Sequence, residues 1–229
     1  MLLLDITPLS LGIETVGGLM DTLLPRNSKV PSSVGRQYTT SVDGQTKLKV
    51  SVYQGERDLV EHNRKLGEFI LKGIPSMAAG MPKIEIIFQL DADGILRVVA
   101  KELRSNVETQ VEIKSTYGIS EEDMARMLLD SIKHAKDDMK VKSLQEAINE
   151  GNSVLNASAK FLTQHNTILT KEEIEETTTL TAALKAEVES GTKDSINQTM
   201  DALNNYTRPL AERAMDHTIK ESLSGKKIG

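Results

Sequence analysis

The periodicity of the hydrophobic residues changes near residue 118, and this change constrains the fold more than any other feature of the chain. Before that point apolar and polar residues alternate, as along residues 84–90, which is the pattern of a half-buried β-strand. After it apolar residues recur every three or four positions, which is the pattern of an amphipathic helix. The change therefore predicts an α+β chain with a domain boundary near Tyr117-Gly118.

The first half contains several short strands separated by turn signals. Alternation predicts strands along residues 48–52, 84–90, 96–100 and 107–113, with Lys47, Lys49 and Ser51 on the solvent side of the first. Asp93-Gly94 lies between the second and third and predicts a hairpin turn with a positive φ angle at Gly94. Short strands with frequent turns are typical of an antiparallel β-sandwich.

The second half opens with a strong signal for the start of a helix. Ser120 can cap the free N–H groups, and the acidic run at residues 121–123 suits the positive end of the helix dipole. The apolar stripe of this helix is expected at Met124, Met127, Leu128, Ser131, Ala135 and Met139.

Two further helices are predicted downstream. Thr170 with Glu173 forms the pattern of a capping box, and the helix that it starts should end at Gly191. A third helix is expected from about Asp194, and Pro209 should kink or interrupt it. These helices could form a bundle that buries its own apolar residues, or a lid over a site on the sandwich, and helical pattern alone favours the bundle.

Composition excludes several classes of function. The chain has 229 residues and a net charge of −5 with both signs mixed throughout, so no basic stripe offers itself to nucleic acid. It contains no cysteine, which rules out disulfides and thiolate metal sites and is compatible with the cytoplasm. The apolar start at residues 2–4 is too short for a signal peptide, and no later segment is expected to span a membrane.

The sequence offers little support for catalysis. The histidines at positions 62, 134, 165 and 217 are scattered, and no metal-ligand spacing is present. Asp91-Ala92-Asp93-Gly94 resembles the start of a calcium loop, but the later acidic ligands of such a loop are missing and a turn is the better interpretation. No glycine-rich phosphate-binding motif occurs, so the chain by itself is predicted to be neither an enzyme nor a nucleotide-binding protein, without catalytic residues, metal or cofactor.

Characteristic blocks of residues occur in order along nearly the whole chain. The blocks are residues 2–15 (LLLDITPLSLGIET), Pro25-Arg26-Asn27, Gln54-Gly55-Glu56-Arg57, Gly73-Ile74-Pro75, Gly80-Met81-Pro82 and residues 88–100. Together they resemble the linker and peptide-binding part of the seventy-kilodalton heat-shock chaperones, the DnaK-type family. The resemblance implies a linker remnant at residues 1–7, a β-sandwich peptide-binding subdomain at 8–118, a helical lid at 119–223 and a flexible tail at 224–229.

The resemblance also implies the residues of a groove that holds an extended apolar peptide. The matching positions are Ile13, Thr15, Val16, Leu19, Tyr38, Thr39, Ser41, Gln45, Leu48, Val50 and Ile84. Family members usually carry a bulky Met in place of Val16, which arches over the peptide together with the residue matching Ser41, so a weak or open arch is expected here. Leu48 replaces a common Val and should change the depth of the pocket.

Two ion pairs fasten the lid of a general stress chaperone, and only one of them is expected in this chain. Arg57 and Asp138 match an ion pair between sandwich and lid, which is expected to form. The second should be absent, because Ala79 and Asn152 replace an Arg and an Asp. An exposed ion pair contributes only about 0–1 kcal/mol, so its loss should tune lid opening without unfolding the protein.

Residues 115–119 (STYGI) and the Arg213–Asp216 segment are similar to the iron–sulfur cluster assembly branch of the family, the HscA type. This branch implies an iron–sulfur scaffold protein as client; the alternative is a general DnaK-type chaperone for unfolded proteins.

Further partners are also implied by the resemblance. The chain is expected to be a piece of a longer cytoplasmic protein whose ATPase domain binds ATP and Mg²⁺ and works with a J-domain co-chaperone. The linker residues Leu2, Leu3, Leu4 and Asp5 would contact that ATPase domain. In its absence these leucines either stay solvated or mediate weak self-association by entering a neighbour's groove.

Overall fold

The structure, a computed structural model, describes residues 6–114 and 119–224, the last four by their backbone alone. The predicted linker contact of residues 2–5, the boundary at Tyr117-Gly118 and the tail beyond residue 224 therefore lie outside the described residues. The chain divides into two compact units between Lys142 and Ser143. This division falls inside helix α1 (Glu121–His165), so the first part of α1 belongs to the same unit as the strands.

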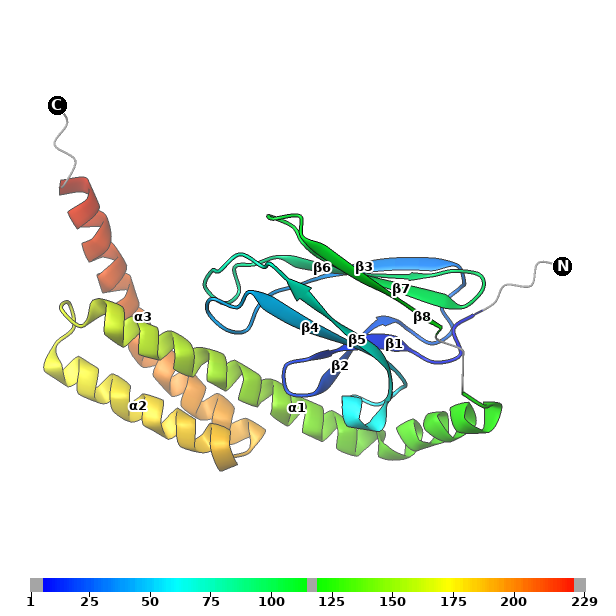
Figure 1. Cartoon of the computed structure of the whole chain (residues 1–229). Coiled ribbons are helices and arrows are strands. Elements are labelled where there is room, and N and C mark those ends of the chain that lie inside the picture. Colours follow the sequence, from blue (N-terminus) through cyan, green and yellow to red (C-terminus); the bar gives the residue numbers. More distant parts are fainter. Residues whose placement is uncertain (1–5, 115–118, 225–229) are drawn as a thin grey trace. The chain divides into compact units, whose positions relative to one another are not determined.

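The first unit contains two antiparallel sheets of four strands each (Figure 1). In chain order its elements are β1 (Leu11–Thr15), β2 (Leu19–Leu24), β3 (Ser32–Tyr38), β4 (Lys47–Gln54), the short 3₁₀ helix η1 (Val60–His62), β5 (Arg64–Lys72), β6 (Ile84–Leu90), β7 (Ile95–Glu102) and β8 (Glu108–Lys114). One sheet has the order β2-β1-β4-β5 and the other β3-β6-β7-β8. Followed by three helices, they confirm the predicted α+β fold with an antiparallel sandwich.

The core of the sandwich follows the alternation of the sequence. Along β6 the four apolar residues of the alternating set are all buried, and Phe88 is fully enclosed. Leu96, Val98 and Ala100 on β7 are buried as well, and both sets belong to one hydrophobic cluster with residues of the other sheet. Burial of each large side chain stabilises the fold by about 1.5–3 kcal/mol.

The outer face of β4 departs from the prediction. Lys47 and Lys49 are exposed as expected, but Ser51 is buried. Tyr53, two residues further along the same face, packs with Met20 and Val60 in a small separate cluster. A residue of η1 thus covers the end of a strand face that the local pattern marks as solvent-exposed.

The hairpin between β6 and β7 has the predicted geometry. Gly94 has a φ angle of 76°, which glycine adopts without steric cost. The Asp91 carboxylate accepts hydrogen bonds from the backbone N–H groups of Asp93 at 3.0 Å and Ile95 at 2.9 Å. The acidic residue therefore organises the turn, in agreement with the turn interpretation of this motif.

The start of α1 confirms the predicted cap but not the whole apolar stripe. The Ser120 hydroxyl accepts a hydrogen bond from the Asp123 N–H at 3.0 Å. Met124, Met127, Leu128 and Ser131 are half-buried, whereas Ala135 is exposed and Met139 is 67% exposed. The prediction is wrong for these last two residues because Asp138, held by Arg57, is the buried position of that turn.

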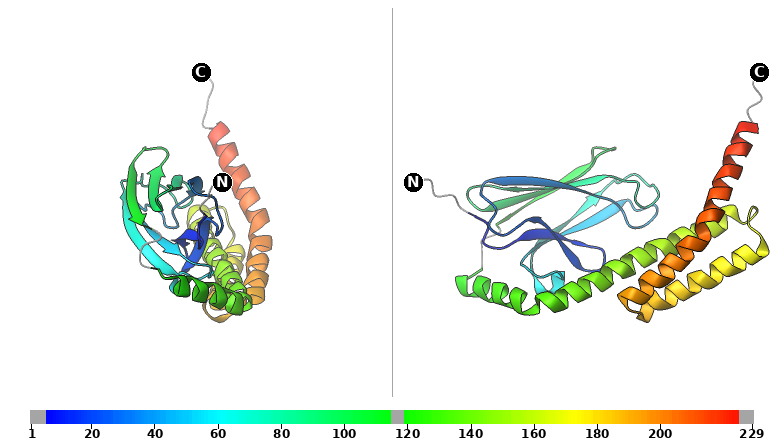
Figure 2. Two further views of the ribbon diagram at one scale, coloured as in Figure 1. Left: turned by 90° about the vertical axis from the view of Figure 1, so that its right-hand side faces the viewer. Right: turned by 180° about the vertical axis from the view of Figure 1, so that it is seen from behind.

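The second unit is a bundle of the remainder of α1 with α2 (Lys171–Ser190) and α3 (Lys193–Ser224) (Figure 2). Its core consists of Ala147, Leu184, Ile196, Met200 and Leu203. All three helices contribute to this core, so the bundle buries its own apolar stripes.

The ends of α2 agree with the sequence, and of the two effects expected of Pro209, interruption of the third helix does not occur. The Thr170–Glu173 capping box forms, and α2 is followed by its C-cap Gly191 as predicted. The helix α3 continues through Pro209 and is not interrupted. Pro209 is exposed, so the carbonyl group that loses its partner can be hydrated. No helix among residues 6–114 and 119–224 has the length and apolar character needed to cross a membrane.

Candidate functional site

The strand unit contains a cavity of about 540 Å³ between the β1–β2 turn and the β3–β4 loop. Its lining consists of Ile13, Glu14, Thr15, Val16, Gly17, Gly18, Tyr38, Thr39, Ser41, Leu48, Lys49, Val50 and Ile86. Eight of the eleven groove residues implied by the family resemblance are in this lining: Ile13, Thr15, Val16, Tyr38, Thr39, Ser41, Leu48 and Val50. The structure therefore gathers residues from positions 13–50 around one hollow.

The cavity has a buried apolar floor and an exposed rim. Ile13, Val50 and Ile86 are each less than 5% exposed, whereas Val16 is 57% exposed and Ser41 is also exposed. Val16 follows β1 directly, at a turn where Gly17 and Gly18 have positive φ angles. Both of these rim side chains are small.

Three of the implied groove residues do not line the cavity. Ile84 is fully buried in the sandwich core. Leu19 is buried and forms an isolated bridge with Leu59. The Gln45 side chain donates a hydrogen bond from Nε2 to the carbonyl oxygen of Lys47 at 2.8 Å, which directs it along its own loop.

Several lining residues were not predicted from the sequence. Ile86 lies two positions after Ile84 on the same face of β6, so alternation alone could not decide which of them reaches the cavity. Glu14 and Lys49 also line it and bring opposite charges to its rim. The family resemblance implied their neighbours Ile13, Leu48 and Val50 but neither charged residue. A charged residue next to an apolar position on a strand usually lies on the solvent-exposed face, so there was no reason from the sequence to place Glu14 or Lys49 in the lining.

Tyr38, at the end of β3, is held by a residue of the opposite sheet. Its hydroxyl donates a hydrogen bond to Oδ2 of Asp21 on β2 at 2.7 Å, and Arg36 forms an ion pair with Oδ1 of the same carboxylate. Burial and the hydrogen bond to Asp21 raise the pKa of the Tyr38 phenol above its ordinary value. The hydroxyl therefore remains protonated and acts as a donor.

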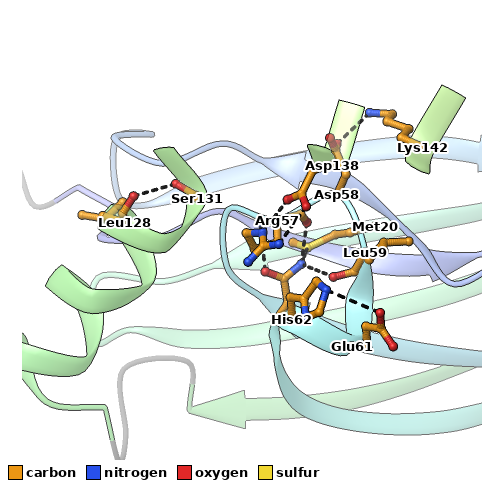
Figure 3. A network of polar contacts seen from close by, with 11 residues as sticks. Met20, Arg57, Asp58, Leu59, Glu61, His62, Leu128, Ser131, Asp138 and Lys142 are labelled. Carbon is orange, nitrogen blue, oxygen red and sulfur yellow. Dashed lines mark hydrogen bonds and ion pairs between the residues drawn. The ribbon is translucent and has the colours of Figure 1, made fainter. Parts of the chain in front are cut away.

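The loop between β4 and β5 contacts α1 through a nearly buried ion pair (Figure 3). Both Nε and Nη2 of Arg57 bond the Asp138 carboxylate, the latter at 2.7 Å. The two side chains are only 13% and 9% exposed. The hydrogen bonds from Arg57 lower the pKa of the Asp138 carboxyl, so the carboxylate stays charged in this partly desolvated place.

A second ion pair lies beside the first and was not predicted. Lys142, one helical turn beyond Asp138, is 3.0 Å from Oδ1 of Asp58. The signal was present in the sequence, because Arg57 and Asp58 carry the opposite charges to Asp138 and Lys142 in the same order. These side chains are 41% and 33% exposed, so the pair is more strongly screened than the first.

The same loop is bonded to the rim of the cavity. The Val60 N–H donates to the Gly18 carbonyl oxygen at 2.9 Å, and the Met20 N–H donates to the Asp58 carbonyl oxygen at 2.8 Å. Gly18 is a lining residue. Two backbone hydrogen bonds thus connect the ion pairs on α1 to the turn that forms one wall of the cavity.

The lining combines an aliphatic interior with polar side chains near its edge. Within the described ranges no group of three or more His, Asp or Glu side chains could hold a metal ion. The buried part of the lining is aliphatic, and the polar side chains lie on its walls and rim. Such a hollow can enclose an apolar side chain while loop groups bond an extended main chain.

The chain matches a known protein family over most of its length. The profile of the family described as "Hsp70 protein" matches residues 1–216. The chain is 44% identical to the "Chaperone protein HscA homolog" of Methylococcus capsulatus and 42% identical to that of Chromobacterium violaceum, over 227 residues in each case. Each match covers 99% of this chain but 37% of the relative, so the chain spans little more than a third of the length of these relatives.

Proposed function

Because the chain belongs to the Hsp70 family, we propose that it is the peptide-binding part of an Hsp70-type chaperone and that its cavity holds an extended apolar segment of a client polypeptide. One observation carries the proposal: eight residues implied by the family resemblance, from positions far apart in the chain, line one hollow with a buried aliphatic floor. The proposal assigns no chemical step to this chain. The role is to bind and release.

The floor and the rim contribute in different ways. An apolar side chain of the client enters between Ile13, Val50 and Ile86, and burial of one Leu-sized group stabilises the complex by roughly 1.5–3 kcal/mol. The loops at the rim exchange hydrogen bonds with the client main chain, as an added strand would. The pocket supplies the preference for apolar side chains, and the main-chain bonds tolerate many sequences.

The helices act as a lid that slows release. The Arg57–Asp138 pair holds the first part of α1 on the loop that is bonded to Gly18 at the cavity wall. Breaking this pair loosens the helix and the wall together. In the full-length protein an ATPase domain with ATP and Mg²⁺, reached through residues 2–5, and a J-domain co-chaperone would drive this opening in the cytoplasm.

The client is proposed to be an iron–sulfur cluster scaffold protein. The similarity of residues 115–119 to the HscA type and the names of the similar relatives support this branch. A peptide-binding measurement separates it from a general chaperone for unfolded proteins.

Fluorescence anisotropy with labelled peptides tests both levels of the proposal. A Leu-Pro-Pro-Val-Lys peptide, the type of segment that the family resemblance leads us to expect in an iron–sulfur scaffold client, should bind more tightly than Leu-rich peptides of equal length without this motif. Equal affinities would support a general chaperone and exclude the scaffold-specific role. Absence of binding to every apolar peptide, by a protein with intact secondary structure, would exclude the peptide-binding function itself.

A further inference from the structure

The carboxylate of Asp21 accepts a hydrogen bond from the hydroxyl of Tyr38, the aromatic residue of the cavity lining. Tyr38 lines the cavity, whereas Asp21, its hydrogen-bond partner at 2.7 Å, does not. Asp21 lies on the edge strand β2 directly opposite Ile13 of the cavity floor. The Asp21 side chain reaches from one sheet to the other. Its Oδ2 atom accepts the hydrogen bond of the phenol, which belongs to a cavity with an aliphatic floor.

Arg36 completes the arrangement from the same strand as Tyr38. The two residues are two positions apart on β3 and therefore lie on the same face. Arg36 pairs with Oδ1 of Asp21 while Tyr38 bonds Oδ2, so each carboxylate oxygen has its own partner. Because Arg36 occupies Oδ1, the other oxygen, Oδ2, is left to accept the hydrogen bond from the phenol.

We propose that Asp21 is a specificity-determining residue, which sets the apolar preference of the cavity by engaging the hydroxyl of Tyr38. Without Asp21, the phenol in this wall would be an unsatisfied polar group unless a ligand supplied a hydrogen-bond partner. A ligand with an amide side chain could supply that partner, and a ligand with an aliphatic side chain could not. With Asp21 in place the hydroxyl is satisfied before any ligand arrives, so an aliphatic side chain is preferred. This inference rests on the proposed function of the cavity.

A purely structural role for Asp21 predicts different behaviour. The Asp21–Arg36 pair also ties the two sheets together, but its side chains are 30% and 45% exposed and such pairs contribute little to stability. If Asp21 only held the two sheets together, its removal would weaken the binding of all peptides alike. Loss of hydroxyl engagement would change the relative affinity for two peptides of similar size.

The test measures the dissociation constants of two peptides that differ at the central position, one with Leu and one with Gln, on the full 229-residue chain. The parent should prefer the Leu peptide. In Asp21→Ala the ratio of the dissociation constant of the Gln peptide to that of the Leu peptide should fall by about 3-fold to 10-fold, the effect of one hydrogen bond. Tyr38→Phe should retain the preference, and the double variant Asp21→Ala/Tyr38→Phe should restore it because the Tyr38 hydroxyl is absent from both.

Asp21→Asn is the matched control, since it keeps an acceptor oxygen, and its preference should stay within twofold of the parent. If Asp21→Ala does not fold, Asp21→Leu provides an acceptor-free side chain of larger volume, with the same narrowing expected. An unchanged preference in the acceptor-free variants, or a double variant that stays narrowed, overturns the inference while leaving the peptide-binding function intact. If the folded parent binds neither peptide, the proposed function and this inference both fail.

Discussion

Lys142 forms an ion pair with Asp58 at 3.0 Å, beside the Arg57–Asp138 pair. Asp58 follows Arg57 directly in the loop, and Lys142 lies one helical turn after Asp138 in α1. The loop carries a positive charge followed by a negative one, and the helix carries a negative charge followed by a positive one. A shift of the helix by one turn would therefore bring like charges together. They also differ in burial, because the side chains of Arg57 and Asp138 are no more than 13% exposed, whereas those of Lys142 and Asp58 are 41% and 33% exposed. The buried pair should therefore contribute more to stability.

Arg57→Met should lower the free energy of unfolding by roughly 1.5–3 kcal/mol, because it leaves the Asp138 carboxylate without its partner in a nearly buried place. Asp58→Asn should lower it by less than about 1 kcal/mol, since water screens the second pair. Urea unfolding followed by circular dichroism provides both values. Arg97→Met, which breaks an exposed pair with Glu112, is the control and should resemble Asp58→Asn. Equal losses for Arg57→Met and Asp58→Asn would contradict the difference in burial.

The Arg57–Asp138 contact should weaken in acid. The pKa of Asp138 is lowered in the folded protein, so the contribution of the pair is complete above the ordinary Asp value of about 3.9 and is lost as the pH falls through the lowered pKa. Between about pH 5 and pH 2 the parent should lose more unfolding free energy than Asp138→Asn, whose side chain does not titrate. Other carboxyl groups titrate in both proteins and cancel in the difference. Parallel curves would show that Arg57 does not stabilise the charged form.

Leu48→Phe should weaken peptide binding by about tenfold or more, equal to at least about 1.4 kcal/mol, because the larger ring occupies the cavity that Leu48 lines. The sandwich should remain folded, since Leu48 is only half-buried. Ile70→Phe adds the same kind of ring on β5, where Ile70 is 47% exposed and is no part of the lining, and should leave affinity unchanged. Anisotropy titrations compare the two. Unchanged affinity in a folded Leu48→Phe variant would place the groove elsewhere.

Truncation should separate the contribution of the first part of α1 from that of the bundle. Residues 2–118 alone should fold and bind peptide but release it faster than the whole chain, because the cavity belongs to the strands and the helices limit escape. Residues 2–142 keep Asp138 and Lys142 and should release peptide more slowly than residues 2–118. Stopped-flow displacement of a labelled peptide measures all three rates. Identical rates for the two truncated proteins would mean that the ion pairs do not restrain the ligand.

Gly151→Ala should destabilise the helical bundle. A methyl group at this buried position would lie 2.6 Å from Cγ2 of Val188, so α1 and α2 would have to separate or repack, at a cost of about 1–3 kcal/mol. Asn152→Ala changes an exposed neighbour on the same helix and should be neutral or slightly stabilising. Thermal unfolding monitored at 222 nm measures the difference. A neutral Gly151→Ala would show that the helices can move apart without loss.

Much of the fold was predictable because its signals are local. The strand along β6, the hairpin at Gly94 and the capping box at Thr170 each depend on residues within a few positions of one another. The family resemblance then identified eight cavity residues in advance. The resemblance also implied Ile84, which is fully buried in the sandwich core, whereas Ile86, two positions further along the same face of β6, lines the cavity.

The amino-acid sequence by itself determined the change from strands to helices, the helix starts, the tight turns and the apolar faces that form each core. Only the tertiary structure decided which strand faces are buried on both sides of the sheet, as at Ser51 on β4. It also decided that Asp138 rather than Met139 is buried on α1. It alone brought Asp21 to Tyr38 and Asp58 to Lys142, pairs separated by 17 and 84 positions. Backbone propensity and periodicity act over a few residues, whereas such contacts depend on how twisted sheets and a long helix meet in space.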